Sequence, residues 1–137
     1  MLVQLNYRAA NALVVSRALC RGCNIAIMSN VLIVKLKRAA NCEDLPLPRK
    51  MTELSAGFDL SAAVKDPVTL APAEIRVIPC GFHMALPPGY EAQVRPRSGL
   101  ASRHGVTLVN TPGTIDADFR GEVMVPVIMR RSGSRPK

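Results

Sequence analysis

The sequence lacks tryptophan and has only two tyrosines and three phenylalanines, so it lacks the interleaved aromatic side chains of a base-stacking surface. Acidic residues are absent from residues 1–42, which carry six basic residues, and from residues 130–137, which carry four. Residues 43–129 hold all ten acids against eight basic residues, so the net charge of +8 comes from the two ends. Basic ends on a nearly neutral body indicate solvated tails rather than a DNA-binding groove. We therefore expect no nucleic-acid partner.

Cysteines are few, and their spacing fits neither a disulfide framework nor a zinc site. The C-R-G-C pair at residues 20–23 is the only close pair among the four. Neither Cys42, Cys80 nor the two histidines supply the second pair that a structural zinc site needs. Free thiols in a reducing compartment are the simpler interpretation.

Long apolar runs are also missing, since none approaches the roughly 20 residues that span a bilayer. We expect no membrane partner and a cytoplasmic location. Residues 1–27 bear arginine, lack acids and are weakly amphipathic, which resembles an organellar transit peptide. They equally fit coding sequence upstream of an internal start at Met28. In the first case the location is organellar, and in both cases we expect these residues to lie outside the fold.

The rest of the chain has the pattern of short strands and frequent turns that is typical of an all-β domain. VLIVKLK at 31–37 is rich in β-branched and aliphatic residues, and IRVIP, FHMAL and EAQVR each alternate apolar and polar side chains. Proline and glycine turn signals separate these predicted strands and leave no room for a long helix. The single helical candidate is Ser98–Gly105, with Ser98 suited to the N-cap and Gly105 to the C-terminal end. The pattern predicts a jelly-roll-like β-sandwich or barrel at residues 28–129, followed by a basic tail at 130–137.

The stretch VTLVNTPGTIDADFRGEV, residues 106–123, places a bare carboxylate in a predicted β-hairpin. VTLVN leads to the turn signal Thr-Pro-Gly at 111–113, and TID follows it. Alternation puts Ile115 on one face of the strand, with Thr114 and Asp116 on the other. A carboxylate held in this way can orient and deprotonate a water molecule. An ordinary surface aspartate beside a turn has the same pattern.

A second polar cluster lies in RPRSGLA at 95–101. Arg97 has a planar, permanently charged side chain suited to phosphate oxygens, and Ser98 adds a hydroxyl group at the start of the predicted helix. Free backbone N–H groups at that helix end favour an anion. An ordinary capped turn with an exposed arginine remains the alternative.

Three stretches together resemble the first three of five motifs of the trimeric deoxyuridine triphosphate nucleotidohydrolases, or dUTPases. They are SAGFDLSAA at 55–63, PRSGLA at 96–101 and GVTLVNTPGTIDADFRGE at 105–122. The resemblance covers roughly residues 31–129. It implies a jelly-roll subunit, a homotrimer with active sites at subunit interfaces, and Mg²⁺-dependent hydrolysis of dUTP to dUMP and pyrophosphate.

The resemblance also implies roles for individual residues. Asp116 matches the aspartate that activates the attacking water, and Asp59 matches a group that orients water around the metal. Phe119 falls where the family usually has a tyrosine that lies against the deoxyribose, and Met124 matches a position beside the nucleoside. Mg²⁺ is expected to ride on the triphosphate, without direct protein ligands. The remaining matches are Arg97, Ser98 and Gly99 for the phosphates, and Asn110, Gly113, Thr114 and Ile115 for the uracil edge.

The C-terminal end departs from the family pattern. After EVMVPVIM the chain continues only through RRSGSRPK, where the family has a further strand pair and the fourth and fifth motifs. Without them we expect unpaired sheet edges, no lid over the phosphates, and weak or no activity. The alternatives are a non-catalytic fragment that binds nucleotide or associates with intact subunits, and a relative of the dCTP deaminases.

Overall fold

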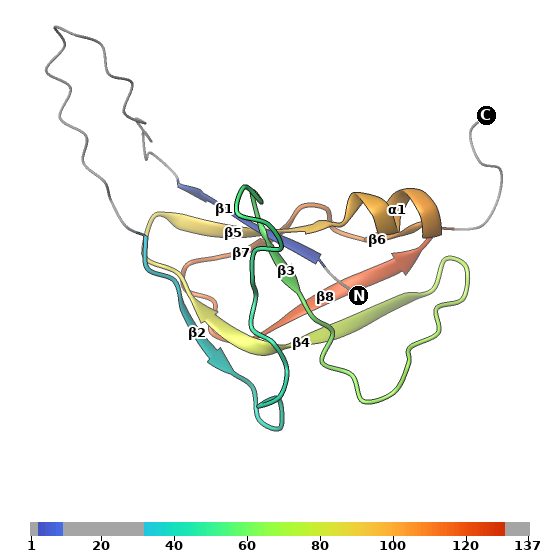
Figure 1. The fold of residues 1–137 in the computed structure, drawn as a ribbon, viewed down its shortest axis with the longest axis horizontal. Helices are drawn as coiled ribbons and strands as arrows, with labels where there is room; N and C mark the ends of the chain where they lie inside the picture. Colours follow the sequence, from blue (N-terminus) through green and yellow to red (C-terminus); the bar gives the residue numbers. More distant parts are fainter. Residues whose placement is uncertain (1–2, 10–31, 131–137) are drawn as a thin grey trace, which may run out of the picture.

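The computed structural model describes residues 3–9 and 32–130. Eight strands and one short helix make up this part of the chain (Figure 1). The strands are β1 (Val3–Ala9), β2 (Lys35–Arg38), β3 (Phe58–Leu60), β4 (Ile75–Ala85), β5 (Tyr90–Pro96), β6 (Val106–Leu108), β7 (Gly113–Ile115) and β8 (Glu122–Met129), and the helix is α1 (Ser98–His104). No helix in these ranges is long and apolar enough to cross a membrane.

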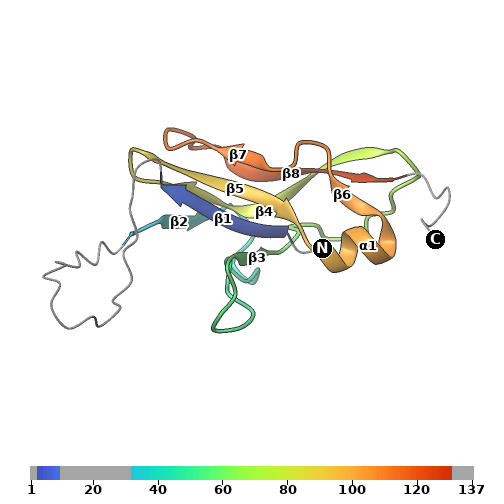
Figure 2. The same ribbon diagram turned by 90° about the horizontal axis from the view of Figure 1, so that it is seen from above.

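The strands form two four-stranded antiparallel sheets, one in the order β3-β1-β5-β7 and the other in the order β2-β4-β8-β6. The predicted all-β sandwich is confirmed, and the helix lies at one end of it (Figure 2). The longest pairing joins β4 to β8, from Ile75 opposite Ile128 to Pro79 opposite Met124.

The core is apolar throughout, because no polar or charged side chain among residues 32–130 is buried. Strand β8 shows how alternation builds it: Val123, Val125 and Val127 are at most 2% exposed, whereas Met124 between them is 51% exposed. Burying a valine side chain contributes about 1.5–3 kcal/mol, so this one strand supplies a substantial share of the stabilisation. Phe82 of β4 and Leu60 of β3 complete the set of largest fully buried side chains.

Strand β4 is longer than the sequence predicts. IRVIP and FHMAL belong to one strand, and the Pro-Cys-Gly signal between them is an irregularity in the pairing with β8 rather than a turn. Gly81 adopts a φ of 74°, which glycine reaches without steric cost. Its N–H donates to Glu122 Oε1 at 3.0 Å, so the backbone group freed by the irregularity is satisfied.

The predicted hairpin at 106–116 is wrong as a pairing, although its strands are real. Strand β6 pairs with β8 in one sheet, and β7 pairs with β5 in the other. The turn at 109–112 therefore carries the chain between sheets. A short strand, a turn signal and a second short strand have the same local sequence pattern whether the strands pair with each other or with two different partners.

The N-terminal segment also differs from the prediction. Residues 1–27 were expected to lie outside the fold, yet Val3–Ala9 forms β1 between β3 and β5. The sequence VQLNYRA alternates apolar and polar residues, and the backbone groups of β3 and β5 would lack this partner without it. Residues 10–31 and 131–137 lie outside the described residues, and so do the predicted start at Met28 and most of the predicted tail.

Candidate functional site

A cavity of about 460 Å³ lies beside the start of α1 and brings together four of the predicted site residues. Asp59 of β3 lines it from one side. Arg97, Ser98 and Gly99 line it from the junction of β5 and α1. Segments about forty residues apart in sequence thus meet in one place. We call this cavity the helix-start cavity.

The start of α1 differs by one residue from the prediction. The N-cap is Arg97, with extended backbone angles of φ −72° and ψ 128°, and Ser98 is the first helical residue. The carbonyl of Arg97 accepts hydrogen bonds from the N–H groups of Leu100 at 3.1 Å and Ala101 at 3.0 Å. No side chain caps the helix start, so the Ser98 hydroxyl is not engaged there. Gly105 ends the helix as predicted, with a φ of 67°.

Asp59 and Arg97 form a loose ion pair in this cavity. Arg97 Nη1 lies 3.8 Å from Asp59 Oδ2, which is within ion-pair range but too long for a hydrogen bond. Asp59 Oδ2 is buried and has no hydrogen-bond partner among the described residues. The backbone at Asp59 is held in place by the neighbouring segment, since the Asp59 N–H donates a hydrogen bond to the Arg49 carbonyl at 2.9 Å. A buried carboxylate oxygen without a partner is costly, which is typical of a position that a ligand or water completes.

The second group of predicted residues lies on β7 and the turn that precedes it. Ile115 is 8% exposed, whereas Thr114 and Asp116 are exposed, so the predicted alternation is confirmed. Gly113 is buried against Asn110: a Cβ atom at Gly113 would lie 3.3 Å from the Asn110 side-chain nitrogen. The sequence therefore places a small residue where this turn folds back on itself.

Phe119 and Met124 are both partly exposed, at 40% and 51%. The Asp116 carbonyl accepts a hydrogen bond from the Phe119 N–H at 3.1 Å, which closes a turn after β7. The phenyl ring lies against Gly121, because a Cβ atom there would be only 2.7 Å from the ring. The ring position thus depends on the absence of a side chain at Gly121.

The two groups do not meet within one chain. Gly113 pairs with Val94 and Ile115 with Ala92, so Asp116 lies toward the start of β5 and Arg97 beyond its end. Six residues of extended chain separate these levels, or on the order of 20 Å at about 3.3 Å per residue. None of Asn110, Asp116, Phe119 or Met124 lines the helix-start cavity.

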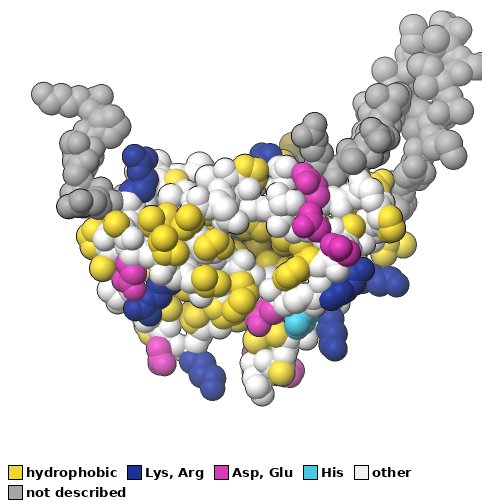
Figure 3. Space-filling view, turned by 180° about the vertical axis from the view of Figure 1, so that it is seen from behind, with side chains coloured by type: hydrophobic (Ala, Val, Ile, Leu, Met, Phe, Trp, Pro, Cys, Tyr) yellow, Lys and Arg dark blue, Asp and Glu magenta, His cyan; other side chains and the backbone are white. Residues whose placement is uncertain are grey.

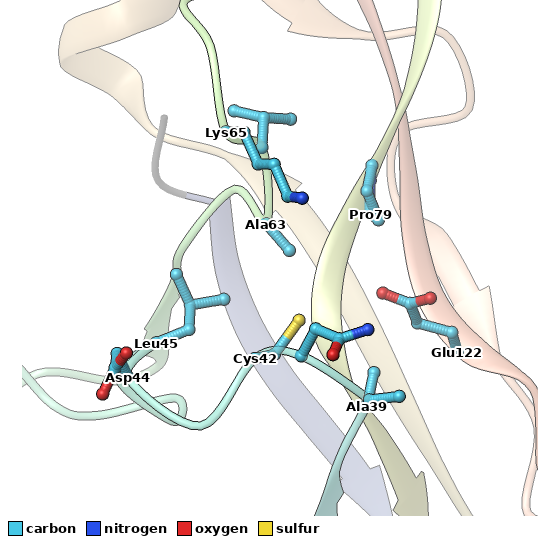
Figure 4. Close-up of a pocket in the computed structure, with 11 residues that line it drawn as sticks. Ala39, Cys42, Asp44, Leu45, Ala63, Lys65, Pro79 and Glu122 are labelled. Atoms are coloured by element: carbon cyan, nitrogen blue, oxygen red, sulfur yellow. The ribbon is translucent and has the colours of Figure 1, made fainter.

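A larger cavity of about 510 Å³ contains none of the predicted site residues (Figure 4). Cys42, Lys65 and Glu122 border it from three different segments. Glu122 already accepts the Gly81 hydrogen bond, and the described residues contain no group of three metal-binding side chains here or elsewhere. Burial, with the Glu122 carboxylate nearby, raises the pKa of the adjacent Cys80 thiol to about 12, so that thiol is unreactive at neutral pH. We assign this cavity no chemistry.

Comparison with known proteins shows the family. The dUTPase family profile matches residues 43–134, which is about two thirds of the chain. The chain belongs to the dUTPase family. The deoxyuridine 5'-triphosphate nucleotidohydrolase of Caldanaerobacter subterraneus subsp. tengcongensis is 55% identical over 97 residues, which are 71% of this chain and 66% of that protein. The enzyme of the same name from Maricaulis maris is 57% identical over 97 residues, covering 69% and 64%.

Solved dUTPases share the fold. A variant of the phage 80alpha dUTPase superposes with a TM-score of 0.64 at 25% identity, covering 77% of this chain and 58% of that one. A variant of the phage phi11 dUTPase of S. aureus, described with a structural Mg(II) ion, gives 0.63 at 24% identity, covering 72% and 61%. This chain thus spans about two thirds or less of the length of the relatives that it matches.

Five of the residues that line the helix-start cavity were not predicted, and Arg103 is the charged one among them. Arg103 lines it, four residues after Gly99 on α1. Residues at this spacing lie on the same side of a helix, so the sequence RSGLASR contained a signal for it once the helix was placed.

Proposed function

We propose that this chain binds dUTP and hydrolyses it to dUMP and pyrophosphate, with Asp116 activating the attacking water. The single observation that carries the proposal is the exposed Asp116 at the end of β7, on the strand face opposite the buried Ile115, in a dUTPase-family chain. Its carboxylate makes no hydrogen bond to another described residue, which leaves its oxygens available to water.

In this reaction the water oxygen forms a bond to the α-phosphorus of dUTP. The bond from that phosphorus to the bridging oxygen breaks, and pyrophosphate leaves with the oxygen. Asp116 accepts the proton that the attacking water loses. Asn110 and the backbone of Gly113–Ile115 read the uracil edge, and Phe119 lies against the deoxyribose, with Met124 beside the nucleoside.

The phosphates occupy the helix-start cavity. The Arg97 guanidinium donates hydrogen bonds to phosphate oxygens. Ser98 adds a hydroxyl group that does not cap the helix, and Gly99 has no side chain to keep a phosphate from the backbone. A variant of the phage 80alpha dUTPase has been solved with dUpNHpp, which supports a nucleotide of this kind as ligand.

The donor set fits a Mg²⁺ ion that arrives with its nucleotide. The described residues contain no group of three metal-binding side chains, so we propose that the ion keeps waters and phosphate oxygens as its ligands. Asp59 Oδ2, which is buried and has no hydrogen-bond partner among the described residues, is an acceptor for a metal-bound water. When bound, the ion neutralises phosphate charge and so assists attack at phosphorus.

We further propose a homotrimer in which different copies supply the two groups of residues. The separation of Asp116 from Arg97 along β5 supports this arrangement, because one chain alone does not bring them together. Exposed large apolar side chains on β4 and β8, namely Ile75, Val77 and Met124, offer surface for association, and Figure 3 shows hydrophobic side chains gathered on one face.

The test is release of pyrophosphate by the purified 137-residue chain with Mg²⁺, using dUTP, UTP and dCTP as separate substrates. We expect pyrophosphate from dUTP well above the other two, and no ammonia from dCTP. Cleavage of all three at one rate, or ammonia release, would overturn the assignment.

A further inference from the structure

We infer that Arg103 is a further phosphate-binding residue of the helix-start cavity and supplies the positive charge that Arg97 alone does not. The inference rests on the proposed function, because it assigns the triphosphate of that substrate to this cavity. The ligand chemistry is a polyphosphate chain.

The charges that line the cavity are those of Asp59, Arg97 and Arg103. Arg97 lies 3.8 Å from the Asp59 carboxylate, so these two charges largely offset each other. Arg103 has no carboxylate within 4 Å among the described residues. It is therefore the uncompensated cation of the cavity, and without it the lining would be neutral overall.

The Arg103 side chain is also held in position. Its Nε donates to the carbonyl of Gly99 at 3.3 Å, one turn back along α1. Its Nη2 lies 2.9 Å from the place where a Cβ atom of Gly99 would be, so the guanidinium occupies the space that glycine leaves open. The terminal nitrogens make no hydrogen bond to another described residue. The fork is thus tethered at one atom and has free donors at the others.

A purely structural role fits these contacts less well. A basic residue in the last turn of a helix ordinarily stabilises the C-terminal carbonyl groups. Arg103 instead points back to Gly99 in the first turn, where the cavity lies. Gly105 already provides the C-terminal cap through its N–H to Ala101 O at 3.1 Å. Free guanidinium donors beside an uncompensated charge match the paired oxygens of a polyphosphate.

The test is calorimetric binding of inorganic tripolyphosphate to the full chain and to Arg103→Gln. The matched control is Arg95→Gln, which removes one nearby exposed charge that donates to Gln93 and does not line the cavity. We expect Arg103→Gln to raise the Kd at least about tenfold, because charge-assisted hydrogen bonds are lost, and Arg95→Gln to change it less than about twofold. Arg103→Lys, which keeps the charge without the fork, is expected to fall between them.

Equal Kd values for Arg103→Gln and Arg95→Gln would overturn the inference, and so would failure of the unsubstituted chain to bind tripolyphosphate. Matched melting temperatures of the variants show that the loss is one of binding and not of folding. The dUTP assay separates this inference from the proposed function. Tripolyphosphate binding through Arg103 without dUTP cleavage contradicts only the function, and cleavage with an unchanged KM in Arg103→Gln contradicts only the inference.

Discussion

The predicted site residues of the helix-start cavity and those around Asp116 differ in how many partners the same chain brings to them. Around the helix-start cavity, β3 and the β5–α1 junction converge, and Asp59 and Arg97 already face each other. The residues around Asp116 lie on an exposed strand end with no charged partner from elsewhere in the described chain. Under the proposed function, one chain supplies the phosphate-binding residues by itself, whereas catalysis needs a second copy to bring Asp116 to them.

The largest expected effect is on catalysis alone. Asp116→Asn keeps the shape of the side chain but removes the proton acceptor, so we expect kcat to fall by about 10²–10⁴. The Kd for a non-hydrolysable dUTP analogue and the melting temperature should stay nearly constant, since Asp116 is exposed. Asp118→Asn, at a neighbouring exposed position, is the control. A comparable loss in both variants would contradict a specific role for Asp116.

Substitutions on the buried face of β7 should lower the stability of the fold. Ile115 is 8% exposed and belongs to the core, so Ile115→Ala is expected to lower the free energy of unfolding by about 2–5 kcal/mol. The exposed Thr114→Ala should change it by less than about 0.5 kcal/mol. Urea denaturation measures both. Similar values for the two variants would mean that β7 does not alternate as described.

A smaller effect is expected on sugar selection. Phe119→Ala removes the ring that lies against Gly121, and we expect the preference for dUTP over UTP in kcat/KM to fall about tenfold. Gly121→Ala should change the preference in the same direction, because its methyl group displaces the ring. Phe119→Tyr keeps the ring and serves as the control. An unchanged preference in Phe119→Ala would remove this residue from the nucleoside site.

The smallest expected effect is on stability at the helix-start cavity. Asp59→Asn should shift the free energy of unfolding by less than about 1 kcal/mol, because its ion pair with Arg97 is 3.8 Å long and the Arg97 side chain is 41% exposed. The same substitution should clearly raise the Mg²⁺ concentration needed for half-maximal activity, because Asp59 is proposed to accept a hydrogen bond from a metal-bound water. Thermal unfolding and a Mg²⁺ titration are the measurements. A large loss of stability without any change in Mg²⁺ dependence would make Asp59 structural.

Sequence alone predicted the parts that depend on local pattern. Alternation identified the strands around β4 and β5, and it placed Ile115 inward and Asp116 outward correctly. The turn predicted at Pro87–Gly89 is confirmed, since the Tyr90 N–H donates a hydrogen bond to the Pro87 carbonyl. The helix end predicted at Gly105 is confirmed as well. These features are set by a few consecutive residues.

What sequence could not predict depends on partners distant in the chain. Local signals at 109–112 do not distinguish a hairpin from a passage between two sheets. The Pro-Cys-Gly signal at 79–81 resembles a turn, although these residues lie within a strand, where the Glu122 carboxylate accepts the hydrogen bond of the Gly81 N–H. Strand β1 depends on β3 and β5, which lie about fifty residues or more away.

The most direct test of the account is complementation between two inactive variants. Asp116→Asn keeps the helix-start cavity, and Arg97→Ala keeps the strand that bears Asp116. Each alone should release little pyrophosphate from dUTP. If different copies supply the two groups, mixing equal amounts under conditions of subunit exchange should restore roughly a quarter of the activity of the unsubstituted chain, as random pairing predicts. A mixture no more active than the average of the two variants would contradict the central claim that the site is shared between copies.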